Sequence, residues 1–486
     1  MASISVDPSR GASPEPARGA HKWAVLAAVG VGTFMSALDA SIVNVVLPVM
    51  GRALGARVAE IEWVLTVYLL VVSGLLLIVG RLGDLRGHKD VYVLGFAGFV
   101  VSSALCGLAG SVQALIAFRA LQALSAAMLF ANAPAILTLS FPPSERGKAL
   151  GMQATMTYLG LTVGPPLGGY LATHLGWRAI FFVNLPVGAF GLWLSLRNVP
   201  RDRPAGATGR FDVPGALLFF LGLLSLLLAL NQGHVWGWAS PATLGLLAAS
   251  AALLSIFVAV ERRRPEPMLD LSLFGSPVFS GAVFSAMLTY VSQFALLFLL
   301  PFYLMGARGL APDAAGRLLV AQPLVMAITA PLSGTLSDRL GARGPIVLGL
   351  LFLAGGLCLL SFIGPTTPLW EVAAGLAVCG LGFGAFVAPN NSRLLGAAPP
   401  NRRGIASGVL AAARNVGMVL GVGLGGAVYT TVVGSGGDEA IPRAVSLATR
   451  LLAGITLVAV ATTWLEGDTA AKARAKRERE TARTGA

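Results

Sequence analysis

The chain has few charged residues for its length. Of its 486 residues only 12% are charged and 55% are hydrophobic, whereas soluble domains carry about 25% charged residues. A water-soluble protein of this composition would need a hydrophobic core larger than a single domain builds. The shortage of charge therefore excludes an ordinary soluble protein and indicates an integral membrane protein. The 60 glycines suit close packing between transmembrane helices.

Cysteine and histidine are also scarce. Cys106, Cys358 and Cys379 lie in apolar segments without CxxC spacing, which predicts packing residues rather than disulfides or metal ligands. The four histidines fall in expected tails or loops, so we expect no metal site. A G-x-x-x-x-G-K-S/T loop and a hydrolase triad are both absent. We therefore expect no enzyme, no ATP use, and no cofactor beyond a proton gradient.

Long apolar runs fill most of the sequence. A helix needs about 20 apolar residues to cross a bilayer, and fourteen windows meet that requirement. The expected fold is an all-α integral membrane protein with 14 transmembrane helices. The cores of the windows are 23–47, 63–83, 91–109, 112–137, 149–172, 180–196, 212–231, 241–260, 279–303, 316–335, 345–363, 369–389, 405–430 and 445–465.

The net charge of +13 is distributed as in a membrane protein. Lys and Arg gather in alternate loops and in both tails, as the positive-inside rule describes, which argues against nucleic acid as a partner. The pattern predicts a multi-pass protein of the cell inner (plasma) membrane with both termini in the cytoplasm. We expect 1–22 to be a disordered cytoplasmic tail and 467–486 to be a basic, solvated cytoplasmic tail, with binding to anionic lipid as the alternative.

One carboxylate interrupts the first window. Asp39 is the only charge between Trp23 and Pro48, and an ionisable group in hydrocarbon is costly unless it is paired, hydrated or neutralised. At 1.5 Å per residue, Asp39 lies roughly 13 Å and Arg119 about 10 Å from the same membrane face. We expect the two groups to meet, so that protonation of Asp39 beside a permanent cation couples transport to protons. A purely structural buried pair is the alternative.

A short motif occurs twice. The stretch Gly80-Arg-Leu-Gly-Asp84-Leu-Arg86-Gly87 follows the second window, and Gly334-Thr-Leu-Ser-Asp338-Arg339-Leu-Gly341 follows the tenth. The repeat predicts an N-terminal six-helix bundle at 23–200, a linker with two extra transmembrane helices at 201–275, and a C-terminal six-helix bundle at 276–466. A carboxylate at such a helix end can pair across the cytoplasmic seam, so we expect a gate; a tight turn with snorkelling charges is the alternative.

Four stretches together resemble the major facilitator superfamily, and most closely its fourteen-helix drug:proton antiporters of the EmrB/QacA type. They are Leu38–Pro48, the loop around Asp84, the fifth-helix motif and Trp177–Pro186. The fifth-helix motif consists of Gly160, Gly164, Pro165, Gly168 and Gly169. The resemblance implies that this motif seals the two halves against uncoupled leak. The chain departs from the family's pattern at three positions. Leu85 is expected to weaken the first gate, and Ala123 and Ser125 are expected to loosen the packing of the fourth helix.

The resemblance also implies a central cavity lined by helices one, four, nine and twelve. Methionine and aromatic side chains suit a plastic, apolar pocket. Arg414, in the thirteenth helix, either binds a substrate anion or braces the C-terminal half. Glu62, at the outer end of the second window, is expected at the membrane interface, where a carboxylate is cheap; a role beside Asp39 is the alternative. The nominated cavity residues are Met35, Asn44, Gln122, Met128, Asn132, Tyr290, Gln293, Phe386, Asn390 and Arg414.

The sequence therefore predicts a proton-coupled antiporter. It would export lipophilic drug-like or natural-product compounds by alternating access and so confer multidrug or antibiotic resistance. The alternatives are a dedicated exporter of one endogenous metabolite or lipid, an importer by symport, and a transporter-like sensor that moves nothing. The expected partners are a small-molecule substrate, protons and the lipid bilayer. A monomer is expected, and no feature demands a periplasmic adaptor, although one is compatible with this subfamily.

Overall fold

The described chain is helical throughout. The computed structural model describes residues 19–142, 145–201, 213–237, 239–262, 271–399 and 403–484, and every regular element in these ranges is a helix. The expected all-α class is confirmed. The disordered tail expected at 1–22 falls almost wholly outside the described ranges, since α1 begins at Gly19.

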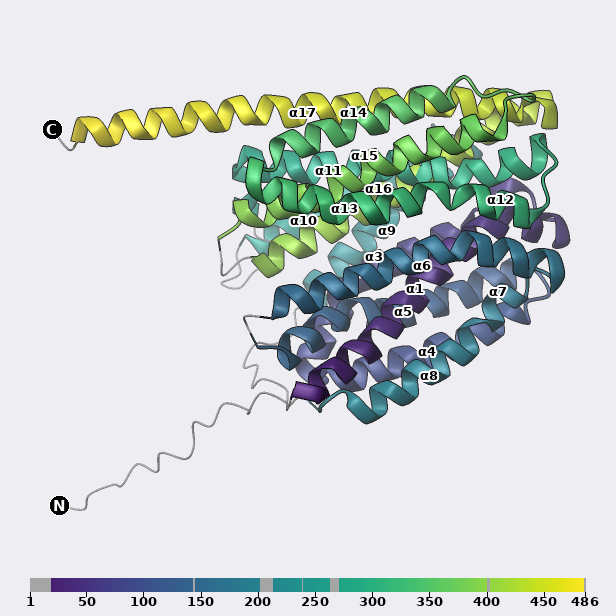
Figure 1. Cartoon of the computed structure of the whole chain (residues 1–486), viewed down its shortest axis with the longest axis horizontal. Coiled ribbons are helices and arrows are strands. Elements are labelled where there is room, and N and C mark those ends of the chain that lie inside the picture. The colour runs from purple at the N-terminus through teal and green to yellow at the C-terminus, as the bar shows by residue number, and fades with distance from the viewer. Residues whose placement is uncertain are drawn as a thin grey trace, which may run out of the picture.

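Helices from the first part of the chain form one bundle. Within it α1 packs against α6, α8 and α5, and α4 packs against α5 and α8. Figure 1 shows these purple to blue helices as a single group. The elements are α1 (Gly19–Ala53), α2 (Val58–Ile61), α3 (Trp63–Arg86), α4 (His88–Gly107), α5 (Val112–Ser140), α6 (Arg146–His174), α7 (Ala179–Phe182) and α8 (Asn184–Asn198).

A second bundle follows in the green to yellow part of the chain (Figure 1). Its strongest associations join α11 to α16 and α17, and α15 to α13 and α14. A five-residue π-helical turn at Tyr303–Ala307 ends α11. The helices are α11 (Pro277–Phe302), α12 (Pro312–Leu319), α13 (Ala321–Leu340), α14 (Arg343–Leu360), α15 (Leu369–Ala397), α16 (Arg403–Gly436) and α17 (Ile441–Thr484).

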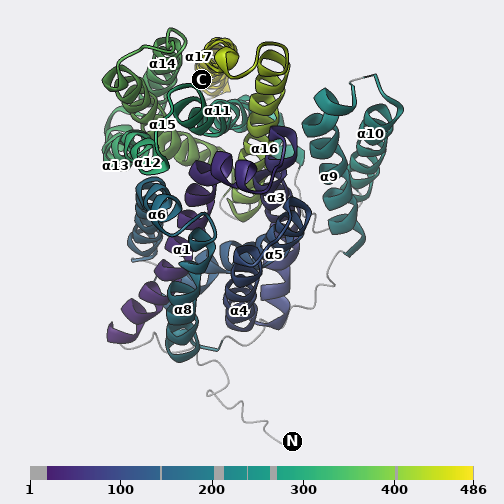
Figure 2. The same ribbon diagram turned by 90° about the vertical axis from the view of Figure 1, so that its right-hand side faces the viewer.

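Two further helices stand beside the bundles. Helices α9 (Val213–Trp236) and α10 (Pro241–Glu261) pack on each other, and α9 also contacts α3 and α16. Figure 2 shows this pair to one side of both bundles. Ser240 caps α10 by accepting a hydrogen bond from the Thr243 amide, and Pro241 occupies the first helical position, as helix N-termini favour. The pair lies where the linker at 201–275 was expected.

The number of membrane-spanning helices is twelve by length and apolar composition within the described ranges. The expected count of fourteen is not confirmed. The two remaining windows, 149–172 and 212–231, are helical in α6 and α9. Helix α6 is not counted because it carries many glycines and polar residues, and it packs against α1 and α12. Helix α9 is not counted because its apolar core spans only Pro214–Ala229.

The C-terminal segment is a continuation of a helix. Helix α17 runs for 44 residues from Ile441 to Thr484, so the tail expected at 467–486 is helical over its described part. Its charged end projects beyond the bundle (Figure 1).

The repeated motif ends two corresponding helices in the same way. Gly87 terminates α3 with φ of 98°, and Gly341 terminates α13 with φ of 85°. An L-residue with a side chain rarely adopts such a φ, so glycine is needed at both turns. Each turn leads directly into the next helix, α4 or α14. The correspondence between the second and tenth windows therefore extends to backbone conformation.

The fifth-helix motif brings α6 against α1 at backbone distance. A Cβ on Gly160 would lie 2.6 Å from the Phe34 carbonyl oxygen, and one on Gly164 would overlap the Ser41 hydroxyl. Ser41 Oγ donates a hydrogen bond to the Gly160 carbonyl at 3.2 Å. These contacts need residues without side chains, as in other closely packed transmembrane helices.

The same motif also forms a close contact between the two bundles. A Cβ on Gly169 would overlap the Pro312 carbonyl oxygen, and one on Gly316 would overlap the Pro165 carbonyl oxygen. Helix α6 therefore meets α12 with no side chain between them. In Figure 1 the bundles lie closest at this end and farther apart at the end from which both termini emerge.

We expect Gly164→Val to destabilise the protein, because the added side chain would collide with Ser41 and the α1 backbone. Overpacking of this kind costs about 1–3 kcal/mol, so the midpoint of thermal unfolding in detergent should fall. Gly151→Val is the matched control on the same helix, because no atom lies within 4 Å of a Cβ built there. Equal effects of the two changes would contradict the packing role of Gly164.

Candidate functional site

Asp39 lies fully buried in the middle of α1. Its carboxylate accepts three hydrogen bonds: from Arg119 Nη1 at 2.6 Å, from Gln122 Nε2 at 3.0 Å and from Asn184 Nδ2 at 2.8 Å. Arg119 and Gln122 belong to α5, and Asn184 begins α8. Charge-assisted hydrogen bonds of this kind offset the cost of removing the carboxylate from water.

Arg119 is held from several sides. Its Nη1 also donates to Gln122 Oε1 at 2.6 Å, and its Nε donates to the Val64 carbonyl on α3 at 3.2 Å. The guanidinium lies over the Tyr68 ring, 4.3 Å from the ring centroid. Ring and guanidinium attract each other through a cation–π interaction. The cation is therefore fixed by contacts on two helices besides its own anion.

Gln122 joins the pair to α4. Its Nε2 donates to Ser103 Oγ at 2.8 Å as well as to Asp39, and its Oε1 lies 3.8 Å from Cys106 Sγ. One amide thus connects the ion pair to α4. Cys106 packs here as a small buried residue.

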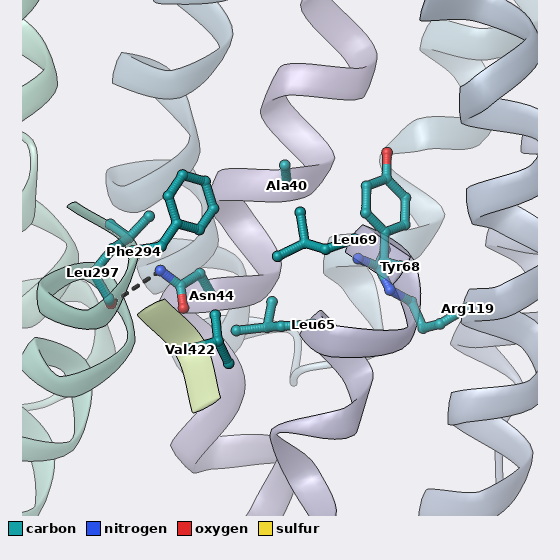
Figure 3. Close-up of a pocket in the computed structure, with 9 residues that line it drawn as sticks. All are labelled: Ala40, Asn44, Leu65, Tyr68, Leu69, Arg119, Phe294, Leu297 and Val422. Carbon is teal, nitrogen blue, oxygen red and sulfur yellow. Dashed lines mark hydrogen bonds between the residues drawn. The ribbon is translucent and has the colours of Figure 1, made fainter. Parts of the chain in front are cut away.

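A small cavity adjoins the ion pair. Its volume is about 30 Å³, which accommodates about two water molecules. Arg119 Nη2 is buried and has no hydrogen-bond partner in the described part of the chain, and Figure 3 shows the guanidinium beside Tyr68 at one end of the cavity. The lining residues come from both bundles: Ala40, Asn44, Leu65, Tyr68, Leu69 and Arg119 from the first, and Phe294, Leu297 and Val422 from the second.

Asn44 connects the bundles across this cavity. It lies five residues after Asp39 on α1, and its Nδ2 donates to the Leu297 carbonyl on α11 at 3.0 Å (Figure 3). Its Oδ1 is buried without a partner among the described residues. A hydrogen bond between halves therefore lies little more than one helical turn from the buried carboxylate.

The sequence analysis expected Glu62 at the solvated membrane interface, but the structure does not place it there. Its side chain is fully buried, and a Cβ on Gly426 of α16 would overlap the carboxylate. The expectation was wrong because depth along a helix does not reveal what the neighbouring helix contributes. A glycine in the second bundle makes the space that encloses this carboxylate.

Several nominated cavity residues instead lie inside single bundles. Met35 is fully buried in the first bundle, where its Sδ would lie 3.1 Å from a Cβ on Gly188. Met128 packs toward Gly95 on α4, and Phe386 is buried in the core of the second bundle. These residues were nominated because their helices are expected to line the cavity, and membership of a helix does not determine which way a side chain faces.

Asn132, on α5, packs against the end of α3 rather than lining the cavity. Its Nδ2 donates to the Met128 carbonyl, and its Oδ1 lies 2.8 Å from His88 Nδ1 in the turn after Gly87. The side chain also fills the space that a Cβ on Gly83 would need. Asn132 thus braces the first repeated motif. The side chains of Asp84 and Asp338, on which the expected gate depends, lie outside the described part of the structure.

The nominated residues of the second bundle fall into two groups. Gln293 accepts a hydrogen bond from Gln322 Nε2 at 2.8 Å, and Asn390 donates to the Ala282 carbonyl at 3.1 Å. Both side chains are thereby engaged within the bundle. Tyr290 and Arg414 lie together, with the Arg414 guanidinium 5.6 Å from the centroid of the Tyr290 ring.

Asn184, Tyr68 and Ser103 were missed as site residues. Asn184 belongs to the Trp177–Pro186 stretch that carried the family resemblance, and this was the available signal. Tyr68 and Ser103 gave none, because an aromatic residue or a serine in an apolar helix is ordinary packing material. No three His, Cys, Asp or Glu side chains within the described ranges could together hold a metal ion.

Comparison with known proteins places this arrangement in a family. The model of the Major Facilitator Superfamily matches residues 29–287 and 282–485. The chain belongs to the major facilitator superfamily. Members of this superfamily are transporters. The protein is therefore an integral membrane transporter for small molecules.

Two relatives cover most of the chain. The riboflavin transporter RibZ of Clostridioides difficile is 34% identical over 82% of this chain and 87% of its own length. The tetracenomycin C resistance and export protein of Streptomyces glaucescens is 33% identical over 89% of this chain and 81% of its own. A bacterial homologue of the lysosomal transporter Spinster, solved inward-facing and occupied, has the same fold, with a TM-score of 0.68 at 16% identity over 93% of this chain and 98% of its own.

We expect Arg119→Met to destabilise the protein strongly at neutral pH. Removing one partner of a buried pair costs about 3–5 kcal/mol, because the other charge stays buried without compensation. The double change Asp39→Asn with Arg119→Met should restore part of the stability, because no uncompensated charge then stays buried. Thermal unfolding of the native protein and the two variants in detergent measures this. An equal loss of stability in the single and the double variant would contradict the pairing.

Proposed function

We propose that this transporter is a proton-coupled antiporter that exports lipophilic drug-like or natural-product compounds by alternating access. The observation that carries the proposal is the buried Asp39–Arg119 pair, with its 2.6 Å bond, next to a cavity lined by both bundles. A titratable carboxylate at a seam that must open and close can link proton binding to conformation. ATP chemistry has no sequence motif in this chain.

Proton transfer to Asp39 changes what Arg119 binds. A neutral carboxyl group holds a guanidinium less strongly than a carboxylate does, whereas Arg119 keeps its charge at any cellular pH. The free Nη2 then has the adjoining cavity, with room for water, as its alternative environment. Movement of α1 relative to α5 would be passed to α11 through the Asn44–Leu297 hydrogen bond.

An inward-facing state is part of the proposal. The contact of α6 with α12 closes one end, and the termini emerge at the other. With both termini in the cytoplasm, as the distribution of Lys and Arg predicts, the closed end is the outer one. The glycines of the fifth-helix motif would then form the outer seal, which must part before substrate can leave.

The substrate class is proposed from the relatives. The tetracenomycin C resistance and export protein and the multidrug resistance protein Stp of Mycobacterium tuberculosis are 33% and 35% identical to this chain. Both names refer to resistance against foreign or toxic compounds. An exporter of a single metabolite is the second candidate, because the relative RibZ is named a riboflavin transporter. A multidrug exporter should expel many unrelated compounds, whereas an exporter of a single metabolite should expel one.

The full topology is also part of the proposal. We place fourteen crossings in the inner membrane, with α6 and α9 added to the twelve apolar spans and both termini in the cytoplasm. The bundles would extend over 23–200 and 276–466, with α9 and α10 in the linker at 201–275. The α9–α10 turn at Gly237 would then face outward.

We expect Asp39→Asn to abolish protection of a pump-deficient bacterial host against the compounds that the native chain expels. The amide retains the shape of the carboxylate but cannot exchange a proton, so export should stop. The measurement is growth on cationic, neutral and anionic toxicants at matched expression. Protection that survives the change would overturn Asp39 as the coupling residue and direct attention to Glu62.

We expect a cysteine at Gly237 to react with a membrane-impermeant maleimide in intact cells, because fourteen crossings place this turn outside. The background should lack Cys106, Cys358 and Cys379. A cysteine at Arg201, which is exposed after α8, is the control and should react only after permeabilisation. The reverse pattern would contradict the proposed orientation.

A further inference from the structure

Arg414 is a half-buried cation without an ionic or hydrogen-bonding partner among the described residues. Its guanidinium takes part in no ion pair and no hydrogen bond with the described residues, and its Nε is buried. Its one described contact is with the Tyr290 ring, at 5.6 Å. A buried donor without an acceptor is costly, and a protein retains one where a ligand completes the site.

A second tyrosine lies near the same cation. Tyr158, from α6 of the first bundle, packs against the core of the second bundle, which contains Tyr290, and lies in electrostatic range of both Tyr290 and Arg414. Within the described ranges neither tyrosine hydroxyl forms a hydrogen bond. Arg414 on α16, Tyr290 on α11 and Tyr158 on α6 thus lie near one another, although they come from both bundles.

Helix packing explains the convergence. Gly417 lies one turn after Arg414, and a Cβ there would be 3.0 Å from Tyr290 Cβ. The absence of a side chain brings α16 against α11 at this level, so Arg414 reaches the Tyr290 ring. The same ring meets Phe383 edge-on at 5.2 Å and lies 6.4 Å from Phe294. An aromatic cluster of Tyr290, Phe294 and Phe383 therefore adjoins the cation.

No carboxylate in the described part of the chain forms an ion pair with Arg414. The one buried acid in the middle of α1, Asp39, is already bonded to Arg119 at 2.6 Å. Glu62 lies against Gly426, which is twelve residues from Arg414 on α16, or about 18 Å along the helix. The neighbourhood of Arg414 therefore has an excess of positive charge and of hydrogen-bond donors. A ligand that completes it must supply an acceptor, and a negative charge fits best.

We propose that Arg414, Tyr290 and Tyr158 form the substrate-binding site and select aromatic compounds that carry an anionic group, such as a carboxylate or a phenolate. This proposal rests on the proposed export function and names its substrate class. Arg414 and the two hydroxyls bind the anionic group, and Tyr290, Phe294 and Phe383 contact the aromatic body. Because Tyr158 and Tyr290 belong to different bundles, a substrate bound between them contacts both halves.

The proposed site also lies next to the proton site. Phe294 contacts Tyr290 on one side and lines the cavity beside Arg119 on the other. Substrate and proton would thus occupy adjacent, separate places, with one aromatic side chain between them. The binding residues and Asp39 can therefore be tested independently.

The test compares two dyes of the same tricyclic shape and opposite charge. Fluorescein is an aromatic anion at neutral pH, and rhodamine 123 is its cationic counterpart. Binding to the full-length protein in lipid nanodiscs is measured by fluorescence anisotropy. Fluorescein should bind more tightly than rhodamine 123. Arg414→Gln should weaken fluorescein binding by about tenfold or more, in line with the loss of a charge-assisted contact, and leave rhodamine 123 unaffected or bound more tightly.

Four further variants sharpen the result. Arg414→Lys keeps the charge and should retain part of the fluorescein affinity, and Tyr158→Phe should weaken fluorescein alone. Arg197→Gln is the matched control, because Arg197 also stacks on an aromatic ring, Trp193 at 5.7 Å, but on an exposed surface. It should change neither affinity. Asp39→Asn should keep fluorescein binding even where it stops export, so failure of the export proposal remains distinguishable.

Selective loss of fluorescein in Arg414→Gln, with partial retention in Arg414→Lys, would support the proposal. An equal loss of both dyes would show that Arg414 only braces the second bundle and would overturn it. Tighter binding of rhodamine 123 than of fluorescein by the native protein, or no binding of fluorescein, would overturn the assigned substrate class.

Discussion

A carboxylate removed from water inside a helical bundle must be stabilised by donors that reach it, and most of the first bundle is arranged around this requirement. Asp39 receives one cationic and two neutral donors from α5 and α8. Arg119, in turn, is anchored to α3 through Val64 and Tyr68, and Gln122 is anchored to α4 through Ser103. Four helices are therefore positioned relative to α1 by one ionisable group.

The location of that group gives it a functional meaning. An ion pair in the centre of one bundle would only stabilise the bundle, but this pair adjoins a cavity whose walls come from both halves. The close α1–α6 packing at Gly160 and Gly164 makes α1 and α6 a unit, and α6 forms the glycine contact with α12. A change at Asp39 is therefore connected to the seam by backbone contacts rather than by long, flexible side chains.

The sequence predicted how deep a residue lies in the membrane, but it did not predict which way a side chain faces around its helix axis. Asp39 and Arg119 could be paired because rise per residue fixes depth. The same arithmetic could not show that Met35 faces its own bundle or that Gly426 encloses Glu62. Ala123 and Ser125 replace the usual glycines, and looser packing was expected. Gly95 and Gly98 on α4 face Ser125 and Met128, so glycines on the partner helix allow a close approach here, which a motif on one helix cannot reveal.

Charge accounting connects the proton site to the proposed substrate site. Each elementary charge that crosses the membrane gains or loses about 2.3 kcal/mol per 100 mV. If a proton enters while a cation leaves, the two contributions cancel, and only the pH gradient drives the cycle. If a proton enters while an anion leaves, both movements carry positive charge inward, so the potential contributes twice. The charge of Arg414 has no anionic partner among the described residues, whereas the charges of Asp39 and Arg119 compensate each other. This arrangement therefore favours export of an anion, and such a cycle uses both the membrane potential and the pH gradient. It needs no second residue that exchanges protons.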